Sequence, residues 1–324
     1  MSEYLLEVKN VSKIFKIGGM LSKKKMLAVD GVSFNIAKGK PVILSIVGES
    51  GCGKSTLCKM ILRLHNMDGG DIVLDGHSYG DRHGYKMSQL FNDVQPIFQN
   101  PFEAFSMRKT VDSYLFNTAQ KLGVASNATD AAKVVDNALK SVGLSLEVVK
   151  GKYSTQFSGG ELQRVSIARA LITKPKIIVA DEPVAMIDAS MKMNIVNLFK
   201  SLKDQYGISF IYITHDLSTA YYVSDYIATL YRGALIEYGS SRQIMDRPAH
   251  PYTQLLMDSI PRIGDKWKDE VAMPDIESKE YLLNGCKFAP RCAYATEECR
   301  KARPEMKLLK GDRKVLCFHP LVQE

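Results

Sequence analysis

The chain has 324 residues, 45% of them hydrophobic, which is enough to bury one sizeable α/β core and to leave roughly 80 to 100 residues for an appended element. The net charge of +8 is compatible with nucleic acid, anionic lipid or a negatively charged ligand, and does not choose among them. The apolar stretches are far shorter than the ~18 to 20 residues that cross a bilayer, and no secretory-signal pattern is visible. We therefore expect a cytoplasmic chain that does not itself cross a membrane.

The first part of the chain alternates strand-like segments with turns. Residues 5–36 form β-type runs, and the basic run at 23–25 lies in a loop that we interpret as a solvated turn. Residues 41–47 form a short, almost continuous apolar strand, and a helix is predicted over 57–64 after an intervening loop. A buried strand that leads through a loop into a helix is the setting in which phosphate-binding loops occur.

The second part of the chain predicts a helical insertion and then more buried strands. Residues 99–157 are polar and helix-prone, with a plausible amphipathic segment at 131–139. The strands predicted at 177–180 and 208–213 are almost entirely apolar, as expected when helices cover both faces of a parallel sheet. After about residue 236, proline and glycine become frequent, which indicates a domain boundary followed by an irregular tail.

The segment after the first buried strand fits the pattern G-x-x-x-x-G-K-[ST]. Its glycines let the backbone wrap round phosphates, so that successive N–H groups and the helix N-terminus face the negative charge. Lys54 would bridge the β- and γ-phosphates of a nucleotide, and Ser55 would offer its hydroxyl to Mg²⁺. We interpret Cys52 as a tolerated small residue. The predicted phosphate-binding residues are Gly48, Glu49, Ser50, Gly51, Cys52, Gly53, Lys54, Ser55 and Thr56.

Two further strand ends carry candidate catalytic groups. The strand at 177–180 leads into Asp181 and Glu182, at the edge where open α/β sheets place ligands. We expect Asp181 to hold Mg²⁺ through water and Glu182 to act as the general base, an effect typically worth about 10²- to 10⁴-fold. His215, after the strand at 208–213, would contact the γ-phosphate and keep the attacking water in line with Glu182. A lone histidine is more often structural, and only this position favours the catalytic role.

The segment Phe157-Ser158-Gly159-Gly160-Glu161-Leu162-Gln163-Arg164, at the start of a predicted helix, resembles the signature motif of the ABC transporter family. The resemblance implies that Ser158, Gly159 and Gly160 reach the γ-phosphate held by a partner subunit. Two glycines at a helix start expose backbone donors and the positive end of the helix dipole to an anion. The family's usual glutamine is Glu161 here, which leaves these donors in place.

The resemblance covers residues 5 to about 235 and assigns three more residues. Phe15 matches the aromatic residue that stacks on adenine, and the alternative that it is a core residue stays open. Gln99 matches the glutamine that touches Mg²⁺ and water and relays the nucleotide state to the helical insertion. Asp188 matches the loop that contacts the partner subunit, where the family's Ser-Ala-Leu-Asp is only half kept.

The implied fold class is α/β, a P-loop NTPase (ABC ATPase) with a parallel-sheet core, an N-terminal antiparallel β subdomain, a helical subdomain and an irregular, cysteine-rich C-terminal extension. We predict an ABC ATP-binding domain over residues 1–240, with its helical subdomain at about 100–170. We predict that the extension occupies residues 241–324.

The tail resembles the C-terminal extension of oligopeptide, dipeptide and nickel importer ATPases, because the segment 250–253 reads His-Pro-Tyr-Thr and four cysteines follow it. The insertion at 18–27 makes the chain more similar to the second of the two paired ATPases. The resemblance favours a [4Fe-4S] cluster, with Zn²⁺ as the runner-up and free thiols as the third interpretation. No sequence feature ties this site to ATP chemistry. The predicted ligands are Cys286, Cys292, Cys299 and Cys317.

We therefore predict the ATP-hydrolysing subunit of an ABC importer that takes up peptides, bound peripherally at the cytoplasmic face of the cell membrane. Nickel or a metal chelate is the alternative cargo. The implied partners are a homologous ATPase subunit, two membrane permeases and, indirectly, an external substrate-binding protein, without nucleic acid. A non-transport ABC ATPase is less favoured, because the chain has neither tandem cassettes nor heptad coiled coils. A nucleic-acid module in the tail is the third reading, resting on the basic residues Lys287, Arg291, Arg300, Lys301 and Arg303.

Overall fold

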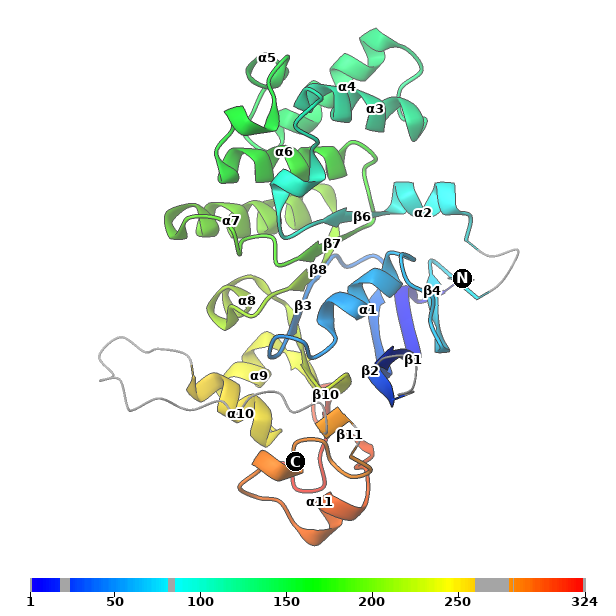
Figure 1. The fold of residues 1–324 in the computed structure, drawn as a ribbon, viewed down its shortest axis with the longest axis vertical. Coiled ribbons are helices and arrows are strands. Elements are labelled where there is room, and N and C mark those ends of the chain that lie inside the picture. Colours follow the sequence, from blue (N-terminus) through cyan, green and yellow to red (C-terminus); the bar gives the residue numbers. More distant parts are fainter. Residues whose placement is uncertain (1, 18–23, 81–84, 260–279, 282, 323–324) are drawn as a thin grey trace. The chain divides into compact units, whose positions relative to one another are not determined.

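The computed structural model describes residues 2–17, 24–80, 85–259, 280–281 and 283–322 (Figure 1). Most of the insertion predicted at 18–27, and Pro261 and Pro274 of the tail, lie outside the described residues. The chain divides into two compact units, and each is described by itself. The first unit comprises residues 1–38, 44–80 and 214–324, and the second comprises residues 39–43 and 81–213.

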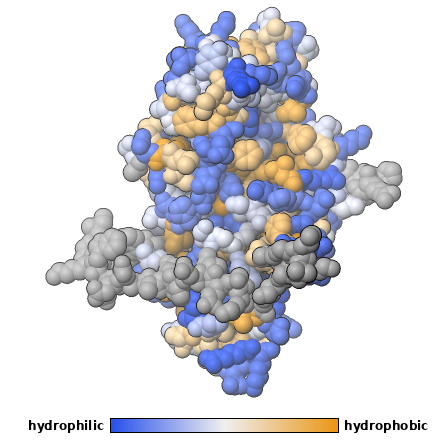
Figure 2. All heavy atoms as spheres, viewed as in Figure 1, coloured by the Kyte–Doolittle hydropathy of each residue, from blue (hydrophilic) through white to orange (hydrophobic). Residues whose placement is uncertain are grey.

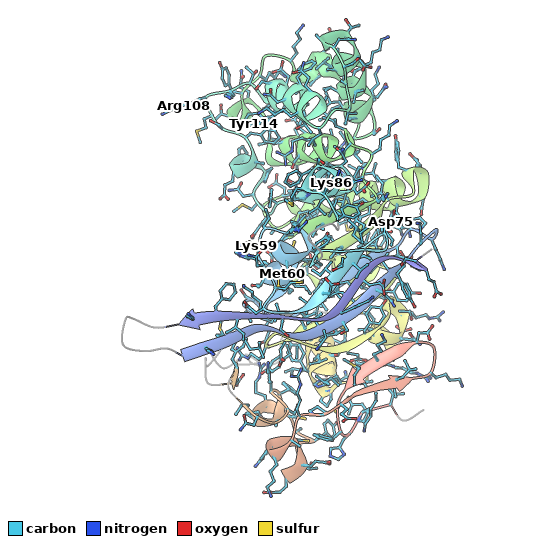
Figure 3. The ribbon with its side chains drawn as sticks, turned by 90° about the vertical axis from the view of Figure 1, so that its right-hand side faces the viewer. Lys59, Met60, Asp75, Lys86, Arg108 and Tyr114 are labelled. Atoms are coloured by element: carbon cyan, nitrogen blue, oxygen red, sulfur yellow. The ribbon has the colours of Figure 1, made fainter. Side chains whose placement is uncertain are left out.

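The first unit contains an antiparallel sheet with the strand order β2-β1-β4-β5. The strands are β1 (Tyr4–Ile17), β2 (Lys24–Ala37), β4 (Gly69–Leu74) and β5 (His77–Ser78). Figure 3 shows β1 and β2 side by side, two long strands paired over most of their length. Alternating apolar residues of these strands are buried, such as Leu6, Val8, Ile72 and Leu74, so the sheet has one core face.

A second sheet of this unit has the strand order β11-β12-β10-β9-β3. Its strands are β3 (Ile43–Val47), β9 (Tyr226–Tyr231), β10 (Ala234–Ser240), β11 (Met306–Leu309) and β12 (Arg313–Leu316). Strand β3 is parallel to β9, whereas β10, β11 and β12 are joined antiparallel. All five residues of β3 are buried, which explains why its sequence is apolar throughout.

The described part of the first unit also contains short helices. They are α1 (Lys54–Ile61), α8 (Leu217–Val223), α9 (Ser241–Asp246), α10 (Pro251–Asp258) and α11 (Glu297–Lys301), with a short 3₁₀ turn at Ala289–Arg291. The predicted irregular tail therefore contains short helices, and its β11–β12 hairpin extends the sheet that contains β9 and β10. Glu237 pairs with Val315 in that extension.

The second unit is built on the parallel strands β6 (Val94–Ile97), β7 (Ile177–Asp181) and β8 (Ser209–Ile213). Its helices are α2 (Met87–Asp93), α3 (Val111–Lys121), α4 (Ala128–Lys140), α5 (Leu146–Val149), α6 (Gly159–Leu171) and α7 (Ala189–Tyr206), with 3₁₀ turns at Pro101–Ala104 and Ser154–Gln156. Tyr114 of α3, labelled in Figure 3, packs edge-on against Phe105 at 5.4 Å between ring centroids.

Several predicted elements are confirmed. The strand predicted at 41–47 is β3, the helix predicted at 57–64 overlaps α1, and the segment at 131–139 lies within α4. The strands predicted at 177–180 and 208–213 are β7 and β8. Each apolar run has the length of a buried strand and is too short for a helix, so the sequence pattern identified both strands correctly.

Among the described residues, no helix is both long and apolar enough to cross a membrane. On the face that Figure 2 draws, hydrophobic residues form separate patches among hydrophilic ones.

Candidate functional site

The loop between β3 and α1 needs glycine at two positions. Gly48 has a φ of 148°, and a Cβ there would lie 2.2 Å from the carbonyl oxygen of Leu230. Gly53 has a φ of 106°, and a Cβ there would lie 2.2 Å from the carbonyl oxygen of Ala28. No other residue type fits these contacts and backbone angles without displacement of the neighbouring strands. The glycines of the motif are therefore required by packing as well as by the shape of a phosphate cradle.

Lys54 is the buried cation of this loop, with only 5% of its surface exposed. Its Nζ donates hydrogen bonds to the carbonyl oxygens of Gly48 and Glu49, at 2.7 and 2.8 Å. At Gly53 no side chain caps the N-terminus of α1, and the first turn holds no acidic residue. The positive end of the helix is thus left for an anion. This arrangement fits a bound phosphate chain.

Cys52 and Phe15 accompany the loop in the first unit. Cys52 is buried, and burial raises the pKa of its thiol, so its surroundings favour a neutral side chain. Phe15, on β1, is half-buried and meets the ring of His65 edge-on at 6.0 Å between centroids. A partly exposed ring of this kind can stack on a base, and its role with adenine stays a prediction.

In the second unit, β7 delivers two carboxylates to one sheet edge. Asp181 is the last residue of β7, and Glu182 follows it in the left-handed backbone region with a φ of 46°. The backbone N–H of Glu182 donates to the carbonyl oxygen of Ile213 at 2.9 Å, which holds this unusual turn in place. Gln99 Nε2 donates to Glu182 Oε2 at 3.1 Å. The structure therefore brings together Gln99 and Glu182, which the sequence analysis could only place on separate segments.

An open cavity of about 510 Å³ lies beside this pair and is lined by Gln99, Asp181 and Arg169. Arg169 comes from α6 and lies over the ring of Phe105 at 5.9 Å, and burial lowers its pKa from the ordinary value. The sequence analysis missed Arg169. The available signal was the one charged residue in the segment 165–171 of the helix that begins with the signature motif.

His215 is exposed and lies two residues after Ile213, the last residue of β8. The preceding residue, Thr214, donates its backbone N–H to the carbonyl oxygen of Ile46 in β3 at 3.4 Å, and Asp216 caps α8. His215 and the phosphate loop belong to the first unit, whereas Glu182 belongs to the second. The predicted alignment of His215 with Glu182 stays a prediction.

The signature segment forms the beginning of α6. Ser158 is its N-cap, with a capping box in which the Glu161 backbone N–H donates to Ser158 Oγ at 3.2 Å and the Ser158 N–H and O–H both donate to Glu161 Oε2. These hydrogen bonds lower the pKa of Glu161. Ser158 is exposed, Gly159 is half-buried, and Gly160 is buried. The glutamate that departs from the family pattern thus stabilises the helix start and leaves Ser158 at the surface.

Asp188 is exposed at the N-terminus of α7. Its carbonyl oxygen accepts hydrogen bonds from the backbone of Met191 and Lys192, and its side chain makes no cap hydrogen bond. Like Ser158, it is placed at the surface of the second unit, as a residue that contacts another subunit must be.

The four cysteines of the tail lie around one small cavity, but the structure does not support a metal site there. Within the described part of the chain, which includes all four, no group of three or more His, Cys, Asp or Glu side chains could hold a metal ion. The cysteines line one small cavity of about 10 Å³, which has room for about one water molecule. Burial raises the pKa of the Cys317 thiol to about 11. The predicted [4Fe-4S] or Zn²⁺ site is therefore not supported.

Four of the five basic residues that the sequence analysis singled out in the tail are engaged in ion pairs within the chain. Lys287 and Arg303 both contact Asp30 at 2.7 Å, Arg291 contacts Glu49 at 3.0 Å, and Lys301 contacts Glu297 at 2.5 Å. Charges that are already paired contribute little to a nucleic-acid surface. This finding disfavours the interpretation of the tail as a nucleic-acid module.

Comparisons with known proteins agree with this geometry. Residues 29–185 match the family "ABC transporter", and residues 236–299 match "Oligopeptide/dipeptide transporter, C-terminal region". The chain is 34% identical to the dipeptide transport ATP-binding protein DppF of Haemophilus influenzae, over 93% of this chain and 92% of the relative. It is also 34% identical to the oligopeptide transport ATP-binding protein AppF of Bacillus subtilis, over 97% of each chain.

The solved structures agree as well. One is a dimeric ATP-binding cassette in a post-hydrolysis state bound to ADP and Pi; it is 28% identical with a TM-score of 0.63, over 73% of this chain and 99% of that one.

Proposed function

Because the chain belongs to the ATP-hydrolysing subunits of ABC transporters, with the fold of a P-loop NTPase, we propose that it drives the uptake of peptides across the cell membrane. The C-terminal extension is the observation that favours peptides as the transported substrate. Relatives that match this chain over nearly their whole length, the extension included, are named for dipeptide or oligopeptide transport. Nickel or a metal chelate is the second candidate cargo, and a role outside transport is disfavoured by the same match.

The phosphate-binding loop is proposed to hold the triphosphate of ATP. Its backbone N–H groups and Lys54 face the phosphates, and Lys54 exchanges its contacts with the carbonyl oxygens of Gly48 and Glu49 for phosphate oxygens. Ser55, Asp181 and Gln99 are the proposed ligands of Mg²⁺ and its water shell. When bound, Mg²⁺ supplies positive charge that neutralises the β- and γ-phosphates.

Hydrolysis is proposed to depend on Glu182 as the general base. Its hydrogen bond with Gln99 and the fixed left-handed turn orient the carboxylate before the reaction, so that it accepts a proton from the attacking water. His215 is proposed to keep that water in line. Ser158, Gly159, Gly160 and Asp188 are proposed to act on the nucleotide of a homologous partner subunit, a role that their position at the surface of the second unit permits.

The permease partners are proposed to dock beside Gln99 on the second unit. Three apolar side chains of this region are exposed, Phe98 and Phe102 at 40% each and Met107 at 73%. Exposed apolar side chains gathered on one segment indicate a surface that another protein covers. This docking would hold the chain at the cytoplasmic face of the membrane, in contact with the substrate-binding protein only through the permeases. We place the boundary between the ATP-binding domain, 1–240, and the extension, 241–324, as part of the same proposal.

Reconstitution of the membrane complex tests the proposal. The full chain, its partner ATPase and the permeases are placed in proteoliposomes with the substrate-binding protein, and ATP hydrolysis is measured with and without peptide. We expect peptides to stimulate hydrolysis and Lys54→Ala to abolish it. Stimulation by a nickel chelate and not by peptides would overturn the choice of cargo, and peptide-stimulated hydrolysis that survives Lys54→Ala would overturn the site.

A further inference from the structure

The C-terminal extension touches the phosphate-binding loop at three points, all within the first unit. The hydroxyl of Tyr252, on α10, accepts the backbone N–H of Glu49 at 2.9 Å. The hydroxyl of Tyr281 donates to the carbonyl oxygen of Gly51 at 2.5 Å. Both terminal nitrogens of Arg291 donate to the Glu49 carboxylate, at 3.0 and 3.1 Å. Two backbone contacts and one bidentate ion pair therefore connect the extension to the loop.

Packing holds the Arg291 side chain in this position. Its guanidinium lies 5.9 Å from the ring centroid of Tyr231 and 5.7 Å from that of Phe288, and it donates to the Tyr231 hydroxyl at 3.5 Å. The side chains of Arg291 and Glu49 are only 10% and 14% exposed. A bidentate pair with so little exposure has a fixed geometry and is weakly screened by solvent and salt.

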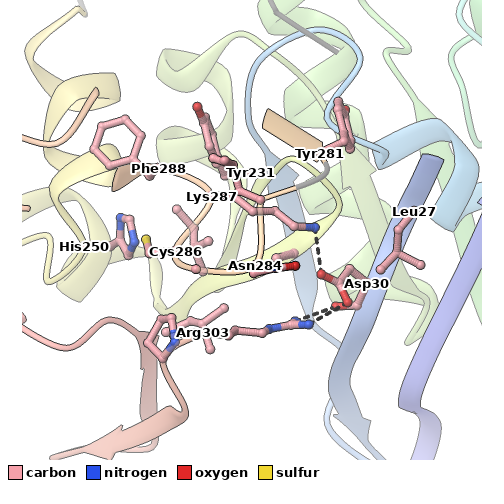
Figure 4. Close-up of a pocket in the computed structure, with 16 residues that line it drawn as sticks. Leu27, Asp30, Tyr231, His250, Tyr281, Asn284, Cys286, Lys287, Phe288 and Arg303 are labelled. Carbon is pink, nitrogen blue, oxygen red and sulfur yellow. Dashed lines mark hydrogen bonds and ion pairs between the residues drawn. The ribbon is translucent and has the colours of Figure 1, made fainter. Parts of the chain in front are cut away.

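The extension is also fastened to the ATP-binding region at a second place. Figure 4 shows Lys287 and Arg303 converging on Asp30 of β2, each at 2.7 Å from the carboxylate. The backbone N–H of Asp30 in turn donates to the carbonyl oxygen of Gly233. Arg291 lies between these two anchoring residues in sequence, so the segment that carries it is attached on both sides.

Arg291 neutralises the negative charge of Glu49 beside the phosphate-binding loop. Glu49 is the second residue of a loop that receives a strongly anionic triphosphate, and a carboxylate so near would repel it. Burial opposes the charge of Arg291, but its hydrogen bonds to Glu49 and Tyr231 raise the pKa, so the side chain stays a cation. The pair is neutral as a whole, and the loop keeps the binding charge of Lys54.

We propose that Arg291 is a positioning residue for nucleotide binding: by holding Glu49 and cancelling its charge, the extension sets the affinity of the phosphate-binding loop for ATP. This inference rests on the proposed role of that loop. It also gives the extension a part in ATP chemistry, which the sequence alone did not indicate.

Titration of the purified full-length chain with Mg-ATP tests the proposal. Arg291→Met keeps the length of the side chain and removes its charge, and we expect the Kd for ATP to rise about tenfold, since one carboxylate is then uncompensated beside the phosphates. Glu49→Gln is expected to lower the Kd, because it leaves Arg291 as an unbalanced cation. The double variant Glu49→Gln/Arg291→Met should return to within about twofold of the parent chain, because no net charge is left at the loop.

Two controls separate positioning from a general structural role. Arg300→Met removes an exposed arginine of the same extension and is expected to leave the Kd unchanged. For Arg291→Met, the KM for ATP in the complex should rise while kcat at saturating ATP stays close to the parent value. An unchanged Kd for Arg291→Met, or a double variant as weak as the single one, would overturn the inference.

Lys54→Ala in the same titration distinguishes a failure of the phosphate-binding assignment from a failure of the role proposed for Arg291. If Lys54→Ala still binds ATP like the parent, the assignment of the loop itself fails. If Lys54→Ala loses binding while Arg291→Met does not, only the inference about the extension fails.

Discussion

Glu182 shows how a single residue is prepared for chemistry. It occupies a left-handed backbone conformation that costs energy for any residue other than glycine, and its N–H is tied to Ile213. The side chain accepts a hydrogen bond from Gln99. Strain of this kind persists only where the surrounding structure enforces it. Here the strained backbone places the Glu182 carboxylate at the end of β7.

The first prediction concerns this carboxylate. Glu182→Gln keeps the shape and the contact with Gln99 but cannot accept a proton, so ATP hydrolysis should fall at least about a hundredfold while ATP binding is retained. Steady-state hydrolysis and equilibrium binding measure the two effects. Glu147→Gln, an exposed residue on α5, is the matched control and should hydrolyse ATP like the parent. Unchanged turnover in Glu182→Gln would show that Glu182 is not the base.

At the scale of elements, the extension is attached by ion pairs as well as by the β10–β12 pairing. Asp30 on β2 is 8% exposed and pairs with Lys287, which is 10% exposed. Burial by itself would raise the pKa of Asp30, but the hydrogen bonds and charges of Lys287 and Arg303 hold it below the ordinary value. The pair therefore stabilises the folded chain while Asp30 is ionised.

The second prediction follows from this attachment. Asp30→Asn leaves Lys287 buried without a counter-charge, and we expect the free energy of unfolding to fall by about 3 kcal/mol. Asp75→Asn, which breaks the more exposed pair with Lys38, should cost less than about 1 kcal/mol. Chemical denaturation near neutral pH measures both losses. Equal losses in the two variants would contradict the role of Asp30.

The same pair has a pH dependence with a definite sign. Because the pKa of Asp30 is lower in the folded chain than in the unfolded chain, the stabilisation is fully present above the unfolded value of about 4. It is lost as the pH falls through the lower, folded value. The difference in stability between the parent and Asp30→Asn should therefore shrink below about pH 4.

At the scale of the whole molecule, function requires a second subunit. Ser158 and Asp188 are exposed, and the Ser158 hydroxyl exchanges hydrogen bonds with Glu161 of its own helix start. We therefore expect the signature segment to act on a nucleotide held by another chain.

The third prediction tests whether the signature segment acts on the nucleotide of a partner chain. Ser158→Arg fills the exposed helix start with a bulky side chain, and it should abolish hydrolysis at the partner's site while this chain still binds its own ATP. Nucleotide binding by the isolated chain and hydrolysis by the assembled pair measure the two properties. Lys54→Ala should give the opposite pattern at the chain's own site. Loss of this chain's own nucleotide binding in Ser158→Arg would refute the assignment to a partner.

The sequence by itself determined the features whose parts are neighbours along the chain. The phosphate loop, the carboxylates at the end of β7 and the signature segment that begins at Ser158 each lie within a few residues, so that their spacing fixes their geometry. The apolar runs of β3, β7 and β8 identified the buried strands for the same reason.

Only the tertiary structure decided which distant residues meet. Gln99 and Glu182 are 83 positions apart, and Glu49 and Arg291 are 242 apart. The spacing of the cysteines suggested a metal site, yet their positions leave only a small cavity among them. The sequence predicted an irregular tail without a link to ATP. In the structure the tail adds a hairpin to the sheet, and its Arg291 donates hydrogen bonds to Glu49 of the phosphate-binding loop. Such contacts depend on how strands and loops pack in three dimensions, and this packing leaves no periodic pattern in the sequence.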